Sequence, residues 1–414
     1  MLGLPLAFSF AVVGFIGIIF MKGLGPGLST LGHAPYSLLA SYTICAIPLF
    51  VLMGQFAFHS KVGRDLFSAG HKWLGHLPGG LFLATTVACT GFAACTGSSV
   101  ASAATMGTLA FPEMERFHYD RRLAAGSVAA GGALGILIPP STMFIIYGII
   151  TETSISQLFI AGFLPGLLLS ALFLVIIFIL CKRNPRLGPI GDSFSWKEKM
   201  ISLTGVWAML ALFLLIMGGL YSGVFAPSEA GTIGAFGAFI IGLARRRLSW
   251  SGFVAALLDT ARITCFALFT LVGAMIFSTF LTVSGLPHVV SDWVTSLPFP
   301  PMVILITILL MYIPLGCVID CFPMILLTIP IIFPIIKNLG FNPVWFGVLI
   351  VVMGEVSLMT PPVGINVYVV QGVTNVPLED VFRGVLPFTI AMLFGIALLV
   401  AFPQISLFLP GMMK

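Results

Sequence analysis

Two pairs of adjacent prolines, Pro139-Pro140 and Pro361-Pro362, lie inside long apolar stretches of the chain. Proline has no backbone N–H and clashes with the preceding helical turn, so two in succession interrupt a helix. Each interruption frees carbonyl oxygens before the prolines and starts a new half-helix after them. Freed carbonyl oxygens suit a desolvated cation, and a helix N-terminus suits an anion. We therefore predict that both breaks bind ions, with a packed proline kink as the alternative.

Polar residues also interrupt two other apolar stretches, residues 80–112 and 301–336. The first contains Thr96-Gly97-Ser98-Ser99 near its middle, and the second contains Gly316-Cys317-Val318-Ile319-Asp320. A long apolar stretch with a polar midpoint predicts a re-entrant hairpin, whose irregular tip must be covered by protein or line a wet cavity. Hydroxyl oxygens and one carboxylate suit Na⁺, because a transition metal would require grouped His or Cys. An acid inside a membrane is a functional candidate, and capping of the following helix is the alternative role for Asp320.

Four further polar residues have weaker signals. Glu355, before the second proline pair, is predicted either to carry a proton or to tie the broken helix to a hairpin. Thr142 and Asn366 follow the proline pairs and are predicted to hydrogen-bond a substrate, whereas Glu229 fits ordinary helix initiation. Enzyme activity is not expected, because no histidine lies in a span near the serines of the first tip and no P-loop is present.

The composition requires a membrane around these residues. Of the 414 residues, 59% are hydrophobic and 8% are charged, against about 25% charged in soluble domains. This excludes a soluble globular protein, a disordered chain and a nucleic-acid binder, and it makes the seven cysteines small core residues. Besides the two hairpins, the predicted spans are 4–21, 36–58, 122–150, 157–181, 200–222, 226–244, 253–283, 343–373 and 385–410.

Four clusters of Lys and Arg are predicted to face the cytoplasm. With this assignment, the hairpin 80–112 starts and ends inside, and the hairpin 301–336 starts and ends outside. The predicted N-terminus is cytoplasmic and the predicted C-terminus is periplasmic. The clusters are Lys61/Arg64/Lys72, Arg116/Arg121/Arg122, Lys182/Arg183/Arg186/Lys197/Lys199 and Arg245/Arg246/Arg247.

A shift of 222 residues superposes the two halves of the sequence. Pro139-Pro140 then falls on Pro361-Pro362, Phe111-Pro112 on Phe333-Pro334, and Ser98 on Asp320. Because the two hairpins start on opposite sides, we predict inverted repeats, which many secondary transporters contain. The predicted architecture is an all-α polytopic membrane protein with a first repeat (1–181), a basic loop and connecting helix (182–222) and a second repeat (223–414).

These motifs resemble the large membrane subunit of tripartite ATP-independent periplasmic (TRAP) transporters, a DctM-like family. The resemblance covers essentially the whole chain, and the two proline-pair motifs preceded by hairpins are fairly specific. The first span is short for the family, so we expect a longer native N-terminus. The matching segments are Gly97-Ser98-Ser99, 133–141 (ALGILIPPS), 226–231 (APSEAG), 358–366 (LMTPPVGIN) and 382–388 (FRGVLPF).

The resemblance implies Na⁺-coupled uptake of a small organic acid, such as a C4-dicarboxylate or a sialic acid, across the bacterial inner membrane. A periplasmic substrate-binding protein would deliver the acid, and a separate four-helix membrane subunit would complete the transporter. The mechanism implied is an elevator, in which hairpins and broken helices slide against a scaffold formed by the first helix of each repeat and 200–222.

The resemblance also implies two sodium sites and a substrate site between the tips. The first sodium site would use the tip residues Gly97, Ser98 and Ser99 with the unwound segment from Gly135 to Ile138. The second would use Cys317, Ile319 and Asp320 with the unwound segment from Ser357 to Thr360. The substrate would lie near Ser98, Thr142, Asp320 and Asn366.

Two alternatives accompany this hypothesis. One is a stand-alone Na⁺- or H⁺-coupled organic-anion symporter that needs no binding protein, and the other is a membrane enzyme or assembly scaffold. No arginine is expected in the substrate pocket, because Arg262 and Arg383 lie near predicted helix ends. The identity of the acid, the Na⁺ stoichiometry and the oligomeric state are beyond the sequence.

Overall fold

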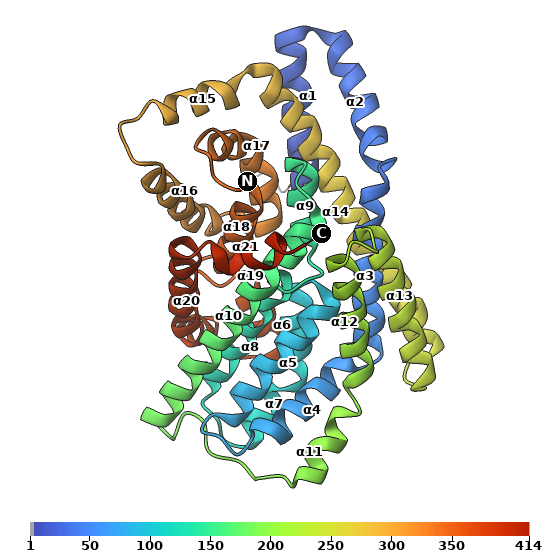
Figure 1. Ribbon diagram of the computed structural model, residues 1–414, viewed down its shortest axis with the longest axis vertical. Helices are drawn as coiled ribbons and strands as arrows, with labels where there is room; N and C mark the ends of the chain where they lie inside the picture. Colours follow the sequence, from blue (N-terminus) through green and yellow to red (C-terminus); the bar gives the residue numbers. More distant parts are fainter. Residues whose placement is uncertain (1–3, 414) are drawn as a thin grey trace.

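The computed structural model describes residues 4–413, and the regular elements in this range are all helices (Figure 1). Apolar runs supply the long helices, and Gly, Pro or Ser directly precede most of the helices. The helices are α1 (Leu6–Lys22), α2 (Leu24–Leu39), η1 (Tyr42–Cys45), α3 (Ala46–His59), α4 (Val62–Leu74), α5 (Gly80–Thr96), α6 (Ser99–Leu109), α7 (Phe111–Arg116), α8 (Arg121–Leu137), α9 (Thr142–Thr151), α10 (Ile155–Arg183), α11 (Trp196–Leu203), α12 (Trp207–Tyr221), α13 (Pro227–Ala244), α14 (Trp250–Ser284), α15 (Leu286–Thr295), α16 (Pro301–Gly316), α17 (Cys321–Asn338), α18 (Pro343–Ser357), α19 (Ile365–Thr374), α20 (Leu378–Ala401) and α21 (Gln404–Gly411).

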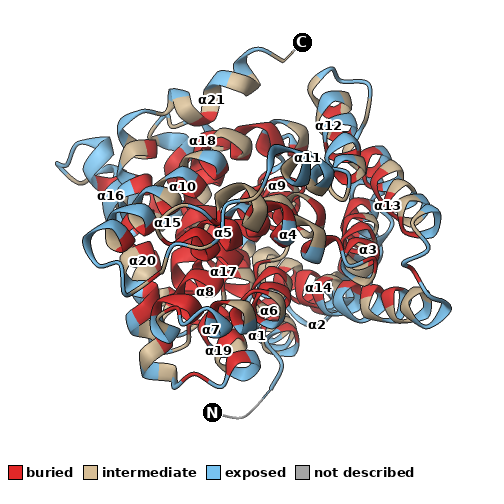
Figure 2. Ribbon diagram, turned by 90° about the horizontal axis from the view of Figure 1, so that it is seen from below, coloured by how far each residue is buried: buried red, intermediate tan, exposed pale blue. Residues whose placement is uncertain are grey.

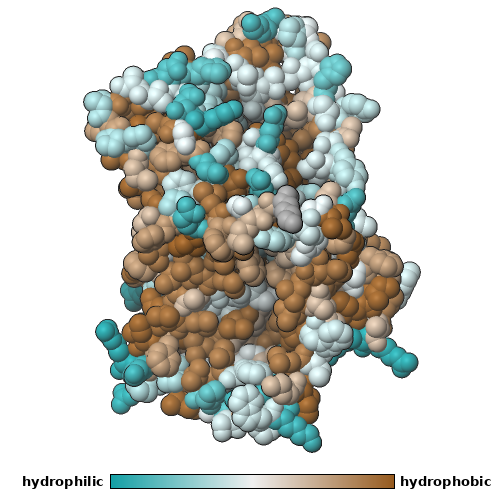
Figure 3. Space-filling model, in the orientation of Figure 1, coloured by the Kyte–Doolittle hydropathy of each residue, from teal (hydrophilic) through white to brown (hydrophobic). Residues whose placement is uncertain are grey.

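Six of the described helices are long and apolar enough to cross a membrane, and two bent pairs raise the number to eight. The pair α8–α9 bends by 41° at the first proline pair, and α11–α12 bends by 52°. Large apolar side chains cover much of the outside, and Figure 3 shows them as a belt between more hydrophilic ends. The structure thus confirms an all-helical polytopic membrane protein with bent helix pairs.

Three predicted spans are wrong in their bounds. The span 36–58 is divided, because α2 ends at Leu39 and a short 3-10 turn precedes α3. The span 200–222 begins as the separate helix α11, and the span 385–410 is interrupted at Pro403, which cannot continue the ladder of α20. The hydropathy of each stretch indicated membrane, but it did not locate these breaks.

Two groups of helices pack on each other. The helix α14 packs on α1 and α3, and α3 packs on α13, so these four helices form a frame, with α1 and α2 beside α14 in Figure 1. The helices α5, α6 and α8 form the centre of a second group, where buried residues are densest (Figure 2). Here α19 packs on α6 and α8, while α9 packs on α17. Each second half-helix after a proline pair therefore contacts the hairpin of the other half of the chain.

The helix α4 connects the frame to this second group. Asp65, in its first turn, accepts hydrogen bonds from Arg245 at 3.3 Å and from Arg247, both in the segment between α13 and α14. Arg245 also donates to the carbonyls of Thr204 and Gly205, before α12. Along the rest of its length α4 packs on α5, where Gly70 lies against Ala84.

Candidate functional site

The first hairpin tip lies between α5 and α6 and consists of Gly97 and Ser98. Gly97 has φ +56°, in the left-handed region that glycine adopts without cost, and a Cβ there would lie 2.4 Å from the carbonyl oxygen of Pro140. Ser98 is extended, and its hydroxyl accepts a hydrogen bond from the N–H of Ala101 at 3.3 Å, which caps α6. The tip therefore ends one helix, starts the next and lies directly against the first proline pair.

The first proline pair separates α8 from α9. Ser141 caps α9 by accepting from the N–H of Phe144, and the hydroxyl of Thr142 donates to the carbonyl of Gly97 at 3.0 Å. A Cβ on Gly135 would lie 2.7 Å from the carbonyl oxygen of Ser98, so the last turn of α8 also touches the tip. The tip and both half-helices form one contiguous group, as the sequence predicts.

The carbonyls before the first proline pair have no partner. Pro139 and Pro140 cannot donate to the carbonyls of Gly135 and Ile136, four residues earlier. In the described part of the chain, no hydrogen bond reaches any carbonyl of residues 135–138. Buried carbonyls are normally paired, so four without a donor beside a hydroxyl-bearing tip are suited to a small cation.

The second hairpin tip lies between α16 and α17 and spans residues 317–320. Asp320 accepts a hydrogen bond from the N–H of Cys321 at 2.8 Å and so caps α17. The capping role that the sequence left open is therefore present, and it leaves carboxylate lone pairs available to a cation. The hairpin approaches α18 at Gly316, where a Cβ would lie 2.0 Å from the Cβ of Ser357.

The second proline pair separates α18 from α19, and its carbonyls are partly used by the segment itself. The N–H of Asn366 donates to the carbonyl of Leu358 at 3.2 Å, and the hydroxyl of Thr360 donates to that of Ser357 at 3.3 Å. The carbonyl of Thr360 accepts from the N–H of Gly364 at 3.1 Å. Both proline pairs contain a cis peptide bond, but the first pair is buried and the second is exposed.

One buried contact joins the two halves of the chain. The hydroxyl of Ser99, at the start of α6, lies 2.7 and 2.8 Å from the two carboxylate oxygens of Glu355 on α18, and both residues are fully buried. Two roles were predicted for Glu355, and the structure contains the one in which this residue ties the broken helix to a hairpin. The sequence offered no sign that the hairpin would be that of the other half.

Two of the four predicted substrate residues share a cavity. Ser98 and Thr142 line a space of about 410 Å³ between the first hairpin and the helices α3 and α14, which we call the tip cavity. Asp320 and Asn366 are not among its lining residues. Asn366 is buried, donates to the carbonyl of Ala129 at 3.5 Å, and has a side-chain oxygen without a partner in the described chain.

Arg262, which was predicted to lie outside the substrate pocket, lines the tip cavity together with Ser98 and Thr142. The helix α14 has 35 residues and spans about 52 Å, longer than a bilayer core, and Arg262 lies in its fourth turn, where its side chain is exposed. The length of the apolar stretch could have indicated that Arg262 lies away from the helix end. The contact of α14 with the hairpin, however, depends on the fold.

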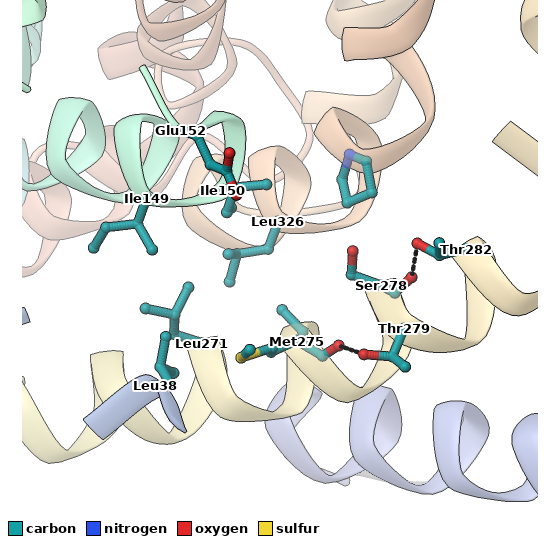
Figure 4. A pocket seen from close by; sticks show the side chains of 12 residues that line it. Leu38, Ile149, Ile150, Glu152, Leu271, Met275, Ser278, Thr279, Thr282 and Leu326 are labelled. Atoms are coloured by element: carbon teal, nitrogen blue, oxygen red, sulfur yellow. Dashed lines mark hydrogen bonds between the residues drawn. The ribbon is translucent and has the colours of Figure 1, made fainter. Parts of the chain in front are cut away.

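A second cavity, of about 350 Å³, lies against the other end of α14 (Figure 4). Its polar residues include Glu152, directly after α9, and Ser278, Thr279 and Thr282 on α14. The threonine hydroxyls donate to carbonyls of their own helix at 2.9 Å, as the dashed lines in Figure 4 mark. The described chain holds no group of three or more His, Cys, Asp or Glu arranged for a metal ion.

Comparisons with known proteins assign this architecture to a family. The model of the family described as "Tripartite ATP-independent periplasmic transporter, DctM component" matches residues 1–405. The C4-dicarboxylate TRAP transporter large permease protein DctM of Pseudomonas aeruginosa is 37% identical over 372 residues, which are 89% of this chain and 86% of that protein. The sialic acid TRAP transporter large permease protein SiaM of Vibrio cholerae is 30% identical over 409 residues, 99% of this chain and 95% of that protein.

One solved structure has a similar fold. The crystal structure of the YdaH transporter of Alcanivorax borkumensis superposes with a TM-score of 0.66, covering 96% of this chain and 97% of that one. At 14% sequence identity this similarity concerns the fold alone. It agrees with the helical hairpins and broken helices described above.

Proposed function

This chain belongs to the family of DctM components of tripartite ATP-independent periplasmic transporters, and from that membership we propose that it imports a small organic acid by coupling to Na⁺. It is a membrane permease and not an enzyme. The relatives above are named for a C4-dicarboxylate and for sialic acid, and both are carboxylates. We extend that substrate class, a small carboxylate, to this chain.

The observation that carries the coupling proposal is the set of unpartnered carbonyls of residues 135–138 beside the first tip. We place the first Na⁺ between these carbonyls and the oxygens of residues 97–99, with Gly135 and Ile138 at the ends of the unwound segment. Hard cations prefer oxygen ligands, and this cluster supplies them without a full charge.

We place the second Na⁺ at the second tip, between residues 317–320 and the segment from Ser357 to Thr360. Asp320 supplies the one full negative charge, and carbonyls that already accept one hydrogen bond keep a second lone pair for the ion. Binding there requires more rearrangement than at the first tip, because the carbonyls of Ser357 and Leu358 have partners.

The substrate carboxylate then enters beside Ser98 and Thr142 in the tip cavity, which Asp320 and Asn366 do not line. Na⁺ binds first and orders the hairpin tip and the broken helix together. The Na⁺-free and Na⁺-bound states therefore differ in their affinity for the anion. The bound Na⁺ also offsets the negative charge that the block carries across the bilayer.

The transport step proposed is an elevator motion of the block formed by α5, α6, α8, α9 and α16–α19 against the frame of α1, α3, α13 and α14. Two observations support it: the helices within each group pack on one another, and two cavities lie between the groups at opposite ends of α14. Each half-helix after a proline pair contacts the hairpin of the other half of the chain, which makes the block one unit.

The partners proposed are a periplasmic substrate-binding protein and a small four-helix membrane subunit, as the family name implies a three-part system. The orientation proposed, with a cytoplasmic N-terminus in the bacterial inner membrane, rests on the clusters of Lys and Arg.

Uptake into proteoliposomes tests this function. The permease is reconstituted with its small subunit, and a receptor loaded with labelled succinate or N-acetylneuraminate is added with and without an inward Na⁺ gradient. Uptake that requires both receptor and Na⁺ supports the proposal. Uptake with Na⁺ alone would support the stand-alone symporter, and uptake that ignores Na⁺ would overturn the coupling.

A further inference from the structure

The tip cavity has two walls of different kind. One wall is the hairpin block, with the hydroxyls of Ser98 and Thr142, and the other is the frame, with Gln55 on α3 and Arg262 on α14. The anion binding proposed above uses only the first wall. The charged residues of the second wall have no role in it.

Arg262 is weakly held. Its Nη1 lies 3.6 Å from Oδ1 of Asp259, one turn earlier on α14, and its side chain is 78% exposed. A separation of 3.6 Å is too long for a hydrogen bond, and no hydrogen bond of its guanidinium occurs within residues 4–413. Its five N–H donors are therefore available to a ligand in the cavity.

Asp259 lies between Arg262 and a histidine. Its other oxygen, Oδ2, lies 3.8 Å from Nε2 of His59, at the end of α3, and that nitrogen is buried without a hydrogen-bond partner. One carboxylate thus faces both Arg262 and His59 at long range. An exposed pair such as Arg262 with Asp259 contributes about 1 kcal/mol or less, so an anionic ligand displaces it easily.

The cavity continues toward a basic rim. A neighbouring space of about 360 Å³, which we call the rim cavity, shares Phe58 with the tip cavity and is lined by His59, Lys61, Arg64 and Thr105. Lys61 and Arg64 belong to one of the clusters predicted to face the cytoplasm. From Ser98 to this rim, the lining contains three permanent cations and a single carboxylate, Asp259.

We propose that Arg262 is an anion-binding residue on the stationary wall, which receives the carboxylate of the substrate from the hairpin tip before it leaves along the rim cavity. The planar guanidinium binds a carboxylate through two parallel hydrogen bonds, a geometry that lysine cannot reproduce. Asp259 competes for the same donors, so the anion is held briefly and released. The inference rests on the proposed function for the identity of the anion as substrate.

Chemical protection tests the site without transport. The wild-type complex of permease and small subunit in nanodiscs is treated with phenylglyoxal, and modification of individual arginines is followed by peptide mass spectrometry. Succinate or N-acetylneuraminate is expected to slow the modification of Arg262 at least about threefold, while the uncharged succinamide has no effect. Equal rates with and without both acids would overturn the proposal.

Arg383 is the internal control, because it is also an exposed arginine paired with an acid on its own helix, Glu379, and lies outside the tip cavity. Its modification is expected to be unaffected by the acids. In Asp259→Asn, the half-protecting concentration of succinate is expected to fall about threefold, because the competing carboxylate is gone. An unchanged or higher concentration would count against the proposed competition.

Uptake assays distinguish a failure of the proposed anion site from a failure of the proposed function. Arg262→Gln is expected to lower the maximal rate about tenfold with little change in the half-saturating concentration of loaded receptor, Arg262→Lys to recover part of the rate, and Arg383→Gln to behave as wild type. If wild type imports the acid but Arg262 is not protected, the anion site alone fails. If Arg262 is protected but wild type imports nothing, the proposed function fails and the anion site stands.

Discussion

The two breaks at the proline pairs differ in what their carbonyls do. Before Pro139, the carbonyls of residues 135–138 accept no hydrogen bond in the described chain, and Thr142 reaches across to Gly97. Before Pro361, the carbonyls are partly used by Thr360 and Asn366 of the same segment. The first proline pair is buried and the carbonyls before it have no donor, whereas the second pair is exposed and its own segment supplies donors to most of the carbonyls.

When the two halves are aligned by the shift of 222 residues, differences at single positions account for this contrast. Thr142 corresponds to Gly364, which has no hydroxyl to reach the second tip, and Ser99 corresponds to Cys321, whose thiol is a weak donor. Ser98 corresponds to Asp320, so a charge at the second tip replaces a hydroxyl at the first. We therefore expect the proposed first site to depend on hydrogen bonds and the proposed second site to depend on charge.

The largest effect is expected at Gly97. In Gly97→Ala, the new methyl would lie 2.4 Å from the carbonyl oxygen of Pro140, in a backbone conformation that alanine rarely adopts. Displacing the tip by about 1 Å is expected to reduce Na⁺-driven uptake about 100-fold or more. Uptake in proteoliposomes measures this. Gly372→Ala on α19, where a Cβ meets no atom within 4 Å, is the control and should transport normally.

Removing the tie between Ser99 and Glu355 should have the next largest effect. Ser99→Ala leaves a buried carboxylate without its donor, which is expected to lower the stability of the complex by about 1–3 kcal/mol. Thermal unfolding in detergent measures the loss.

A double variant identifies the cause of that loss. Ser99→Ala combined with Glu355→Met removes both polar partners and should be more stable than Ser99→Ala alone. Cys321→Ala, at the corresponding position of the second hairpin, removes only a small apolar contact and should cost about 1 kcal/mol or less. Additive losses in the double variant would contradict the tie.

Asp320→Asn tests the charge at the second tip. Asparagine can still accept from the N–H of Cys321, so the cap on α17 is retained while the charge is lost. The Na⁺ concentration for half-maximal uptake is expected to rise about tenfold, a loss of about 1.4 kcal/mol. Ser98→Ala, which removes a neutral ligand and the cap of α6, is expected to raise it only about threefold. Equal shifts in both variants would refute the distinction between the tips.

The smallest effect is expected at Val318. This side chain is 65% exposed at the second tip. Val318→Ser is expected to change uptake and stability less than about twofold, since exposed positions away from caps and buried networks tolerate substitution. A large loss on uptake assays would show that another surface covers this tip during transport.

Much of this architecture follows from local signals. Proline pairs, polar interruptions and apolar length predicted both hairpins and both breaks, because each depends on a few neighbouring residues. The helix α2 was missed because Gly25 and Pro26 resemble a linker, although both lie in its first turn, where a missing N–H is tolerated.

The remaining features of the site depend on tertiary packing. Ser99 and Glu355 are 256 residues apart, and nothing local pairs them. The position of Arg262 beside the first hairpin likewise arises only when α14 packs against that hairpin. The inverted repeats and the ion sites themselves stay predictions.

The attachment of α4 to the frame through Asp65 has a mechanical consequence. Asp65 fastens one end of this 13-residue helix to Arg245 and Arg247 of the frame, while the rest packs on α5. A helix of this length is a rigid rod of about 20 Å, and pivoting by about 30° at the clamped end would carry its far end about 10 Å. In the proposed elevator, α4 is thus a lever: its length sets the stroke, and inserting one helical turn beyond Asp65 should lengthen that stroke in proportion.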